Sequence, residues 1–187
     1  MKGVVTVRVI SGILKGRNII GFDLDGTRPT MDRVKESLFS TIQGKIMDSI
    51  CLDLFAGSGN LGIEAISEGA KEVYFVDNNI KAIKVINNNI ENFNIKDKSK
   101  VLNMNYVKAL EYLKEKKFDI IFLDPPYKTN YIENSIKLID EYNLLNDDGI
   151  IICESSSIDK IIYTDKFKAI KDKRYGDKFI VILEKLC

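Results

Sequence analysis

The chain has 187 residues, 45% of them hydrophobic, so one globular domain with a sizeable core is expected, and its net charge of +1 excludes a generally basic nucleic-acid coat protein. It contains no histidine, which excludes mechanisms that need an imidazole base or histidine metal ligands. Three cysteines without CxxC spacing predict free thiols in a reducing cytoplasm rather than a disulfide framework or a zinc site. No apolar run reaches about eighteen residues, so no membrane-spanning helix is expected. The first residues lead straight into an alternating strand pattern, so no signal peptide is expected.

The first 26 residues predict a basic β-hairpin. Apolar and polar residues alternate over residues 4–9, and residues 18–22 follow after a loop with two glycines, so two short antiparallel strands are expected. The first twenty positions hold no acidic residue and four basic ones: Lys2, Arg8, Lys15 and Arg17. The last three are candidates for phosphate contacts, although such residues also occur on ordinary solvated strands.

A helix is predicted next, with Thr30 as its N-cap residue. Apolar residues recur at helical spacing: Met31, Val34, Leu38 and Ile42. Val34, Leu38 and Ile42 should face the core. The core does not need Arg28, Arg33 or Lys35. These cations are therefore candidates for contact with a ligand or an RNA, with plain solvent exposure as the alternative.

From residue 48 onward, strands alternate with helices, which is typical of a parallel, doubly wound sheet. The predicted strands cover residues 50–55, 72–77, 100–103, 118–123 and 149–154, and the helices cover 61–67, 79–92, 107–114 and 132–142. Residues 167–173 and 179–183 should form a hairpin that turns at Gly176. We predict one domain over residues 1–187. It has an α/β core at 27–187, with a mostly parallel, seven-stranded Rossmann-like sheet, and the hairpin at 1–26 as an appendage.

Residues 53–62 connect the first of these strands to a helix through a glycine-rich turn. Gly57, Gly59 and Gly62 match the pattern G-x-G-x-x-G, and Asp77 lies twenty residues past Gly57, at the end of the next strand. This combination is the fingerprint of dinucleotide-binding proteins, with the acid for the ribose. Taken alone, it keeps an oxidoreductase with a nicotinamide or flavin cofactor as a candidate.

Asp53 favours a different cofactor, because it precedes the turn at the carboxyl end of the strand. A pyrophosphate would have to bind near the following helix N-terminus, where this carboxylate would repel it. A carboxylate instead suits a cation such as the α-ammonium of a methionine group, and Asp77 could accept both ribose hydroxyls. S-adenosylmethionine fits this charge pattern better than a dinucleotide does.

Asp124-Pro125-Pro126-Tyr127 directly follows the predicted strand at 118–123. Two consecutive prolines fix their own φ angles and keep the preceding residue extended. Asp124 and Pro125 are therefore rigidly placed at a strand's carboxyl end, where open α/β sheets bind ligands. Two acceptors beside an aromatic ring suit a flat base bound through its amino group. A strand-ending turn with an exposed tyrosine is the alternative.

These segments resemble known enzyme families. Residues 53–59 are similar to motif I of class I methyltransferases, and residues 124–127 to the (Asp/Asn)-Pro-Pro-(Tyr/Phe) motif of amino-group methyltransferases. More narrowly, the chain resembles the RsmD family of bacterial 16S rRNA guanine-N2 methyltransferases through residues 8–17, 28–36 and 175–177.

The resemblance implies S-adenosyl-L-methionine as the cofactor and the N2 amine of a guanine in 16S rRNA as the target. It implies these catalytic residues: Asp124, Pro125, Pro126 and Tyr127. The implied cofactor site consists of Thr30, Asp53, Phe55, Ala56, Gly57, Ser58, Gly59, Asp77, Asn78, Asn105 and Tyr106. The implied RNA contacts are Arg8, Lys15, Arg17, Arg28 and Arg33. Asp77 departs from the glutamate common in the family, and Asn105 from an aspartate that often contacts the adenine.

The expected partner is 16S rRNA, alone or within the small ribosomal subunit or an assembly intermediate, and the expected state is a monomer. Adenine-N6 DNA methyltransferases and glutamine-N5 protein methyltransferases use a similar four-residue motif, so they are alternatives. The oxidoreductase and a catalytically silent RNA-binding module are the others.

Overall fold

The computed structural model describes residues 6–21, 28–126, 130–157 and 161–186, without the side chains of residues 6 and 28–31. The main sheet contains β3 (Ile50–Asp53), β4 (Glu72–Asp77), β5 (Ser99–Asn103), β6 (Phe118–Leu123), β7 (Leu145–Ser155), β8 (Phe167–Tyr175) and β9 (Lys178–Lys185). Their order is β5-β4-β3-β6-β7-β9-β8. β3 to β7 are parallel, whereas β9 runs antiparallel to both of its neighbours. The predicted α/β fold with a mostly parallel, seven-stranded sheet is confirmed.

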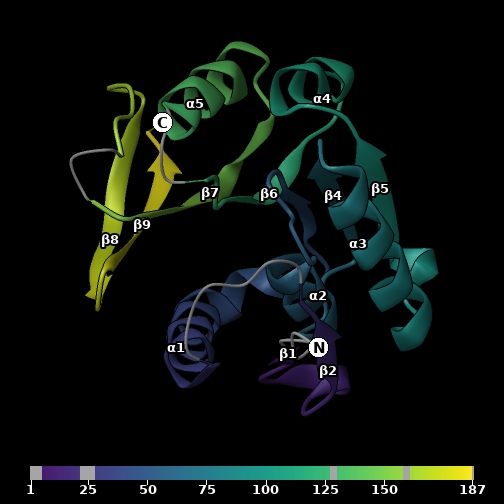
Figure 1. Ribbon diagram of the computed structural model, residues 1–187. Helices are drawn as coiled ribbons and strands as arrows, with labels where there is room; N and C mark the ends of the chain where they lie inside the picture. The colour runs from purple at the N-terminus through teal and green to yellow at the C-terminus, as the bar shows by residue number, and fades with distance from the viewer. Residues whose placement is uncertain (1–5, 22–27, 127–129, 158–160, 187) are drawn as a thin grey trace.

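Helices cover both faces of this sheet. They are α1 (Arg28–Ile46), α2 (Asn60–Ser67), α3 (Ile80–Phe93), α4 (Tyr106–Tyr112) and α5 (Tyr131–Glu141). The first three pack on one face and the last two on the other, so the sheet is doubly wound (Figure 1). Within the described ranges, no helix is long and apolar enough to cross a membrane.

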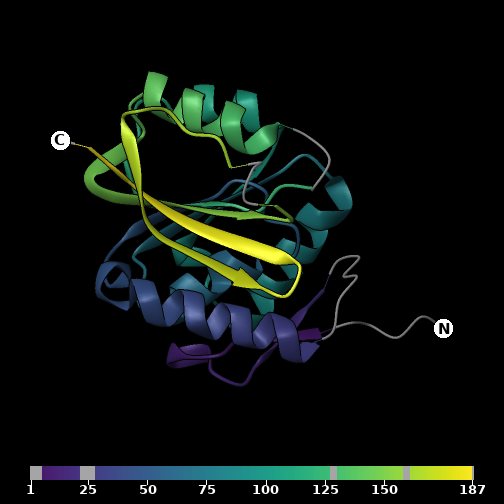
Figure 2. The same cartoon turned by 90° about the vertical axis from the view of Figure 1, so that its left-hand side faces the viewer.

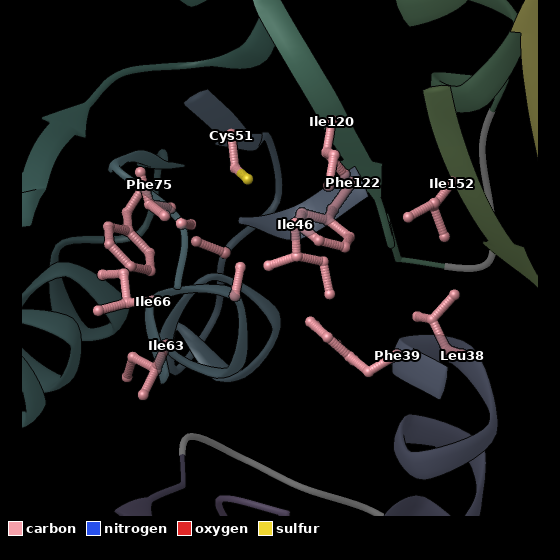
Figure 3. Close-up of a cluster of buried hydrophobic side chains, with 14 of the residues drawn as sticks. Leu38, Phe39, Ile46, Cys51, Ile63, Ile66, Phe75, Ile120, Phe122 and Ile152 are labelled. Carbon is pink, nitrogen blue, oxygen red and sulfur yellow. The ribbon is translucent and has the colours of Figure 1, made fainter. Parts of the chain in front are cut away.

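Side chains of the central strand β6 alternate between two buried clusters. Phe122 belongs to the cluster under α1, α2 and α3, where Figure 3 shows it near Phe39 of α1; the two ring centroids are 6.0 Å apart. Ile121 and Leu123 belong to the cluster under α4 and α5. Burial on both faces explains the continuous apolar run of this strand. It also fixes the register, because a shift by one residue would exchange the two faces.

The helix α1 begins at Arg28, so the prediction of Thr30 as its N-cap was wrong. Pro29 lies in the first turn, where its missing N–H costs no intrahelical hydrogen bond and its fixed φ suits the helix. The predicted core positions are confirmed as buried: Val34, Leu38 and Ile42.

The N-terminal segment forms a separate antiparallel pair, β1 (Thr6–Arg8) and β2 (Asn18–Ile20), as predicted. Figure 2 shows these purple strands beneath α1, on the opposite side of that helix from the yellow β8–β9 hairpin. Gly12, between the two strands, has a φ of +74°, and a Cβ there would lie 1.8 Å from the carbonyl oxygen of Ser67. Glycine therefore permits the close contact of this loop with α2.

A buried ion pair attaches the segment to the core. Glu64 of α2 is fully buried and accepts hydrogen bonds from the backbone N–H groups of Ile10 and Ser11, at 2.8 and 2.9 Å. Lys35 of α1 is also buried, lies 2.7 Å from Glu64 and donates to the carbonyl oxygen of Arg8. Burial lowers the pKa of Lys35, and the Glu64 carboxylate opposes that shift. The prediction that Lys35 faces a ligand or an RNA was wrong, since the pair with Glu64 uses its charge.

We expect Lys35→Met to lower the free energy of unfolding by about 3–5 kcal/mol, because it leaves the Glu64 carboxylate buried without its counter-charge. The control is Lys137→Met, which removes the exposed pair with Glu133 on α5 and should cost about 0.5 kcal/mol or less. Urea denaturation measures both values. Similar losses for the two variants would contradict the importance of the buried pair.

Candidate active site

Acidic residues gather at the carboxyl edge of the sheet, where the parallel strands end. Asp53 ends β3, Asp77 ends β4, and Asp124 directly follows β6. The pairing of β3 with both β4 and β6 places these ends side by side. Open α/β sheets bind their ligands at this edge. The structure therefore brings together the three carboxylates that were predicted to form one site.

The glycine turn, residues 56–59, connects β3 to α2. Gly57 and Gly59 have φ angles of 54° and 79°, which L-amino acids with a side chain rarely adopt. A Cβ on Gly57 would meet no atom within 4 Å, whereas a Cβ on Gly59 would lie 3.3 Å from the Phe75 ring. The turn thus faces open space on one side and packs tightly against β4 on the other, which suits close approach of a ligand to its backbone.

Asp53 and Asp77 both accept hydrogen bonds from this region of the backbone. Asp53 is buried, and its Oδ2 accepts from the N–H of Gly62 at 3.1 Å. The two oxygens of Asp77 accept from the N–H groups of Gly57 and Asn79, at 2.9 and 2.8 Å. Burial raises the pKa of Asp53 to about 7, although the Gly62 bond opposes this. Among the described residues no cation is paired with the Asp53 carboxylate, and a cationic ligand group would supply the compensating charge.

The other two residues of the turn are fixed by neighbouring elements. Ala56 is buried and donates its N–H to the carbonyl oxygen of Val76 at 2.9 Å. The Ser58 carbonyl oxygen accepts from Asn89 Nδ2 at 3.0 Å. Asn89 is fully buried on α3 and also bonds the backbone N–H and carbonyl of Ile20 in β2, at 2.9 and 3.0 Å. Asn89, which was not predicted from the sequence, therefore links the hairpin to the glycine turn.

An aromatic cluster lies at the same edge, against α4 and α5. The half-buried rings of Phe55, Tyr106 and Tyr131 have centroids 5.1 to 5.7 Å apart. Phe55 and Tyr106 were predicted as cofactor contacts, and the structure brings them together. Tyr131 was not predicted. Its place at the start of the helix after Asp124 is the only signal for it in the sequence.

Two predicted cofactor residues, Asn78 and Asn105, are exposed. Asn105 is the N-cap of α4, where its Oδ1 accepts from the N–H of Lys108 at 3.0 Å. An amide oxygen has a second lone pair, and the amide nitrogen has two donors. The capping bond is therefore compatible with the predicted contact to an adenine.

Asp124 is half-buried, Pro125 is buried and Pro126 is exposed. Tyr127 lies outside the described residues. Leu123 of β6 is paired with Cys153 of the parallel strand β7. The next residue of each chain is therefore adjacent to the other, so Asp124 lies beside Glu154. The two acceptors predicted for an amino group, the Asp124 carboxylate and the Pro125 carbonyl, thus stand between β3 and β7.

Charged neighbours act on Asp124. Burial raises its pKa well above the ordinary value, and the Glu154 carboxylate raises it further, whereas the Lys178 ammonium lowers it. Lys178, the first residue of β9, forms an ion pair with Glu154. Neither Glu154 nor Lys178 was predicted as a site residue. The sequence places Glu154 at the end of a strand but gives no sign that a hairpin brings Lys178 to it.

Basic residues predicted to contact RNA lie on the N-terminal segment and α1. A cavity of about 470 Å³ between these elements is lined by Arg8, Val9, Ile10, Lys15, Gly16, Asp32, Arg33 and Glu36. Three of the five predicted RNA contacts therefore line one cavity. Arg8 is paired with Asp32 at 2.9 Å, whereas Lys15 and Arg33 are exposed.

Arg17 does not line that cavity. Its guanidinium lies 4.6 Å from the centroid of the Phe93 ring and donates to the carbonyl oxygen of Asn92 at the end of α3. The side chains of Arg28 and Thr30 lie outside those that the structure describes.

Known proteins are similar to this chain over most of its length. The family model described as "Conserved hypothetical protein 95" matches residues 7–184. YlbH of Bacillus subtilis is 43% identical over 150 residues, which cover 79% of this chain and 82% of that protein. Ribosomal RNA small subunit methyltransferase D of Haemophilus influenzae is 35% identical over 91% of this chain and 89% of its own length. The solved structure of yhhF from Escherichia coli has a TM-score of 0.85 at 27% identity, over 97% of this chain and 98% of that one.

The doubly wound sheet with its antiparallel β9, and the glycine turn at its carboxyl edge, define a class I methyltransferase. The chain belongs to the RsmD family, as the match of the family model and of relatives such as the Haemophilus influenzae protein shows. The family predicted from the sequence is confirmed, whereas the roles of single site residues stay predictions.

Asn105→Ala should lower the free energy of unfolding by about 1 kcal/mol, because α4 loses its N-cap. Asn105→Asp keeps a side-chain acceptor at the same place and should unfold at nearly the wild-type urea concentration. Comparing cofactor affinity in the two variants separates capping from binding. If Asn105 contacts the adenine through its amide nitrogen, the Asp variant will bind the cofactor more weakly despite its intact cap.

Proposed function

We propose that this protein methylates the exocyclic N2 amine of one guanine in 16S ribosomal RNA, with S-adenosyl-L-methionine as the methyl donor. The observation that carries the proposal is the position of Asp124 and Pro125. Two acceptors suited to an amine follow β6 directly, and β6 is paired with β3, which leads through Asp53 into the glycine turn. The relative named ribosomal RNA small subunit methyltransferase D supports small-subunit RNA as the substrate.

The residues around the glycine turn fit this cofactor. The buried Asp53 carboxylate would be compensated by the α-ammonium group, and Asp77, oriented by Gly57 and Asn79, would accept the ribose hydroxyls. The open space at Gly57 allows close approach to the backbone. Phe55 and Tyr106 offer aromatic surface for the adenine. The bound cofactor supplies an electrophilic methyl group on a positively charged sulfur.

The acceptor pair would activate the substrate amine. The N2 lone pair of guanine is delocalised into the ring and is a weak nucleophile. We expect the Asp124 carboxylate and the Pro125 carbonyl oxygen each to accept one N2–H, which raises the electron density on nitrogen and orients its lone pair. Positive charge develops on N2 as the new N–C bond forms, and the Asp124 carboxylate stabilises it. The nitrogen then loses one proton, to Asp124 or to water, so a chain without histidine suffices.

The base must leave its stack to reach Asp124, so the target is a flipped or unpaired nucleotide. Tyr127 would stack on it, a contact worth about 1–3 kcal/mol for each base. Lys15 and Arg33, exposed at the cavity beside the hairpin, would bind phosphates of the RNA. We expect a cytoplasmic monomer that acts on 16S rRNA, on the small subunit or on an assembly intermediate.

Asp124→Ala should reduce methyl transfer to small-subunit rRNA by about 10²–10³-fold, because the amine loses the carboxylate that stabilises its developing charge. Cofactor affinity should stay near the wild-type value. The control is Asp147→Asn, which changes an exposed aspartate at the far end of β7 and should leave transfer unchanged.

Tritiated S-adenosylmethionine, offered separately with rRNA, DNA and protein, measures this effect. Undiminished transfer by Asp124→Ala would contradict the assignment of Asp124. Transfer by the wild type to DNA or protein, but not to rRNA, would contradict the proposed substrate.

Cofactor affinity should depend on pH through Asp53. Since the pKa of Asp53 is raised to about 7, the carboxylate is largely ionised above that pH and largely protonated below it. Protonation removes the charge that binds the ammonium group, so affinity should fall up to about tenfold between about pH 7.5 and about pH 6. Calorimetry at both pH values tests this. Asp53→Asn should bind more weakly and without that pH dependence; an equally steep dependence in this variant would exclude Asp53 as the cause.

A further inference from the structure

Glu154 and Lys178 form a charged pair next to Asp124 that the proposed mechanism does not yet use. The strands that carry the three residues are neighbours, in the order β6, β7, β9. Leu123 of β6 is paired with Cys153 of β7, so Asp124 and Glu154 follow as the next residues of parallel chains. Lys178 begins the antiparallel β9 at the same edge, and its Nζ contacts Glu154 Oε1.

The three side chains also lie on the same face of the sheet. Phe122, Ile152 and Ile180 all belong to the cluster packed against α1, and Figure 3 shows the first two on that side. Side chains two residues apart in a strand point to the same face. Asp124 is two positions after Phe122, and Glu154 is two positions after Ile152. Lys178 is two positions before Ile180, because β9 runs in the opposite direction. All three therefore lie toward the carboxyl edge. The effect of both Glu154 and Lys178 on the pKa of Asp124 agrees with this arrangement.

This charged pair is largely withdrawn from water. The Glu154 side chain is only 11% exposed and that of Lys178 27%. Burying an ion pair costs desolvation energy that its attraction often fails to recover. The Glu154 carboxylate also disfavours the ionised form of Asp124, which the mechanism needs. A pair with these costs, beside the predicted amine site, points to recognition of a ligand.

The pattern of acceptors and donors matches the edge of a guanine. The Watson–Crick edge of guanine presents, in order, the N2 amine, the N1–H donor and the O6 acceptor. Across the strands, Asp124 offers an acceptor, Glu154 a second acceptor and Lys178 a donor. An adenine bound through its N6 amine would present the unprotonated N1 next to that amine. A carboxylate would repel that lone pair.

We propose that Glu154 accepts the N1–H and Lys178 donates to the O6 of the target base, so that this pair selects guanine. The inference rests on the proposed function, since it needs the N2 amine to be bound at Asp124. A carboxylate has about four lone-pair positions, so a bond from Lys178 is compatible with accepting a further N–H. Sites built to hydrogen-bond a substrate reject analogues that cannot pair, because buried polar groups are then left without partners.

The base 2,6-diaminopurine tests the pair directly. It keeps the N2 amine that receives the methyl group but replaces the N1–H by a lone pair and the O6 by an amino group. The substrates are two small-subunit RNAs, made by ligation, that differ only at the nucleotide that the wild type methylates. One RNA carries guanosine at this position and the other carries the 2,6-diaminopurine nucleoside. We expect the wild type to prefer guanosine by about 10²-fold or more in kcat/KM.

Glu154→Gln should reduce that preference to about tenfold or less, because the glutamine amide can donate to the N1 of 2,6-diaminopurine.

Lys178→Met should lower transfer to guanosine while leaving transfer to the analogue unchanged or increased. The matched control is Glu184→Gln on β9, which breaks a surface pair with Lys168 far from the carboxyl edge and should leave the preference unchanged. Cofactor affinity, measured for every variant, reports on folding.

The outcomes separate this inference from the proposed function. If Glu154→Gln and Lys178→Met lower transfer to both RNAs by the same factor, the pair has a structural role and the inference is overturned. It is also overturned if the wild type methylates both RNAs equally well, while the proposed function stands. Failure of the wild type to methylate the guanosine RNA overturns both.

Discussion

Negative charge concentrated at one edge of the sheet is the constraint on which this site depends. Parallel pairing brings the carboxyl ends of neighbouring strands together, and four carboxylates lie at or next to these ends: Asp53, Asp77, Asp124 and Glu154. Burial raises the pKa of Asp53 and Asp124, the Asp77 carboxylate raises that of Asp53 further, and the Glu154 carboxylate raises that of Asp124 further. The only compensating cation in contact among the described residues at this edge is Lys178. Such an edge is suited to a cationic methyl donor and to a base that offers N–H groups.

The N-terminal hairpin is attached to this site by polar contacts. Glu64 and Lys35 connect the hairpin to α2 and α1, and Asn89 connects it to the glycine turn through Ser58. These groups are buried and satisfied by specific partners, so the hairpin has one position relative to the turn. The cavity between the hairpin and α1, lined by Lys15 and Arg33 for which phosphate contacts are proposed, therefore lies at a fixed place relative to the glycine turn.

Periodicity and motifs predicted most of the fold because they are local. The strand from Phe118 to Leu123 is flanked by polar residues and two prolines, and its predicted bounds match the structure. The glycine turn could be located for the same reason. Lys35 was assigned to the wrong environment, since its partner Glu64 lies on another helix and no spacing in the sequence relates the two. Lys178 and Asn89 were missed for the same reason, as tertiary packing alone brings them to the site.

We propose that this protein forms one N2-methylguanine in 16S rRNA and that Asp124 is required for this reaction. Mass spectrometry of small-subunit rRNA from cells that lack the protein tests it most directly. One N2-methylguanine should be missing, the wild-type protein should restore it, and Asp124→Ala should not, despite normal binding of the cofactor. An rRNA with all its N2-methylguanines intact in cells without the protein, or full restoration by Asp124→Ala, would contradict the account.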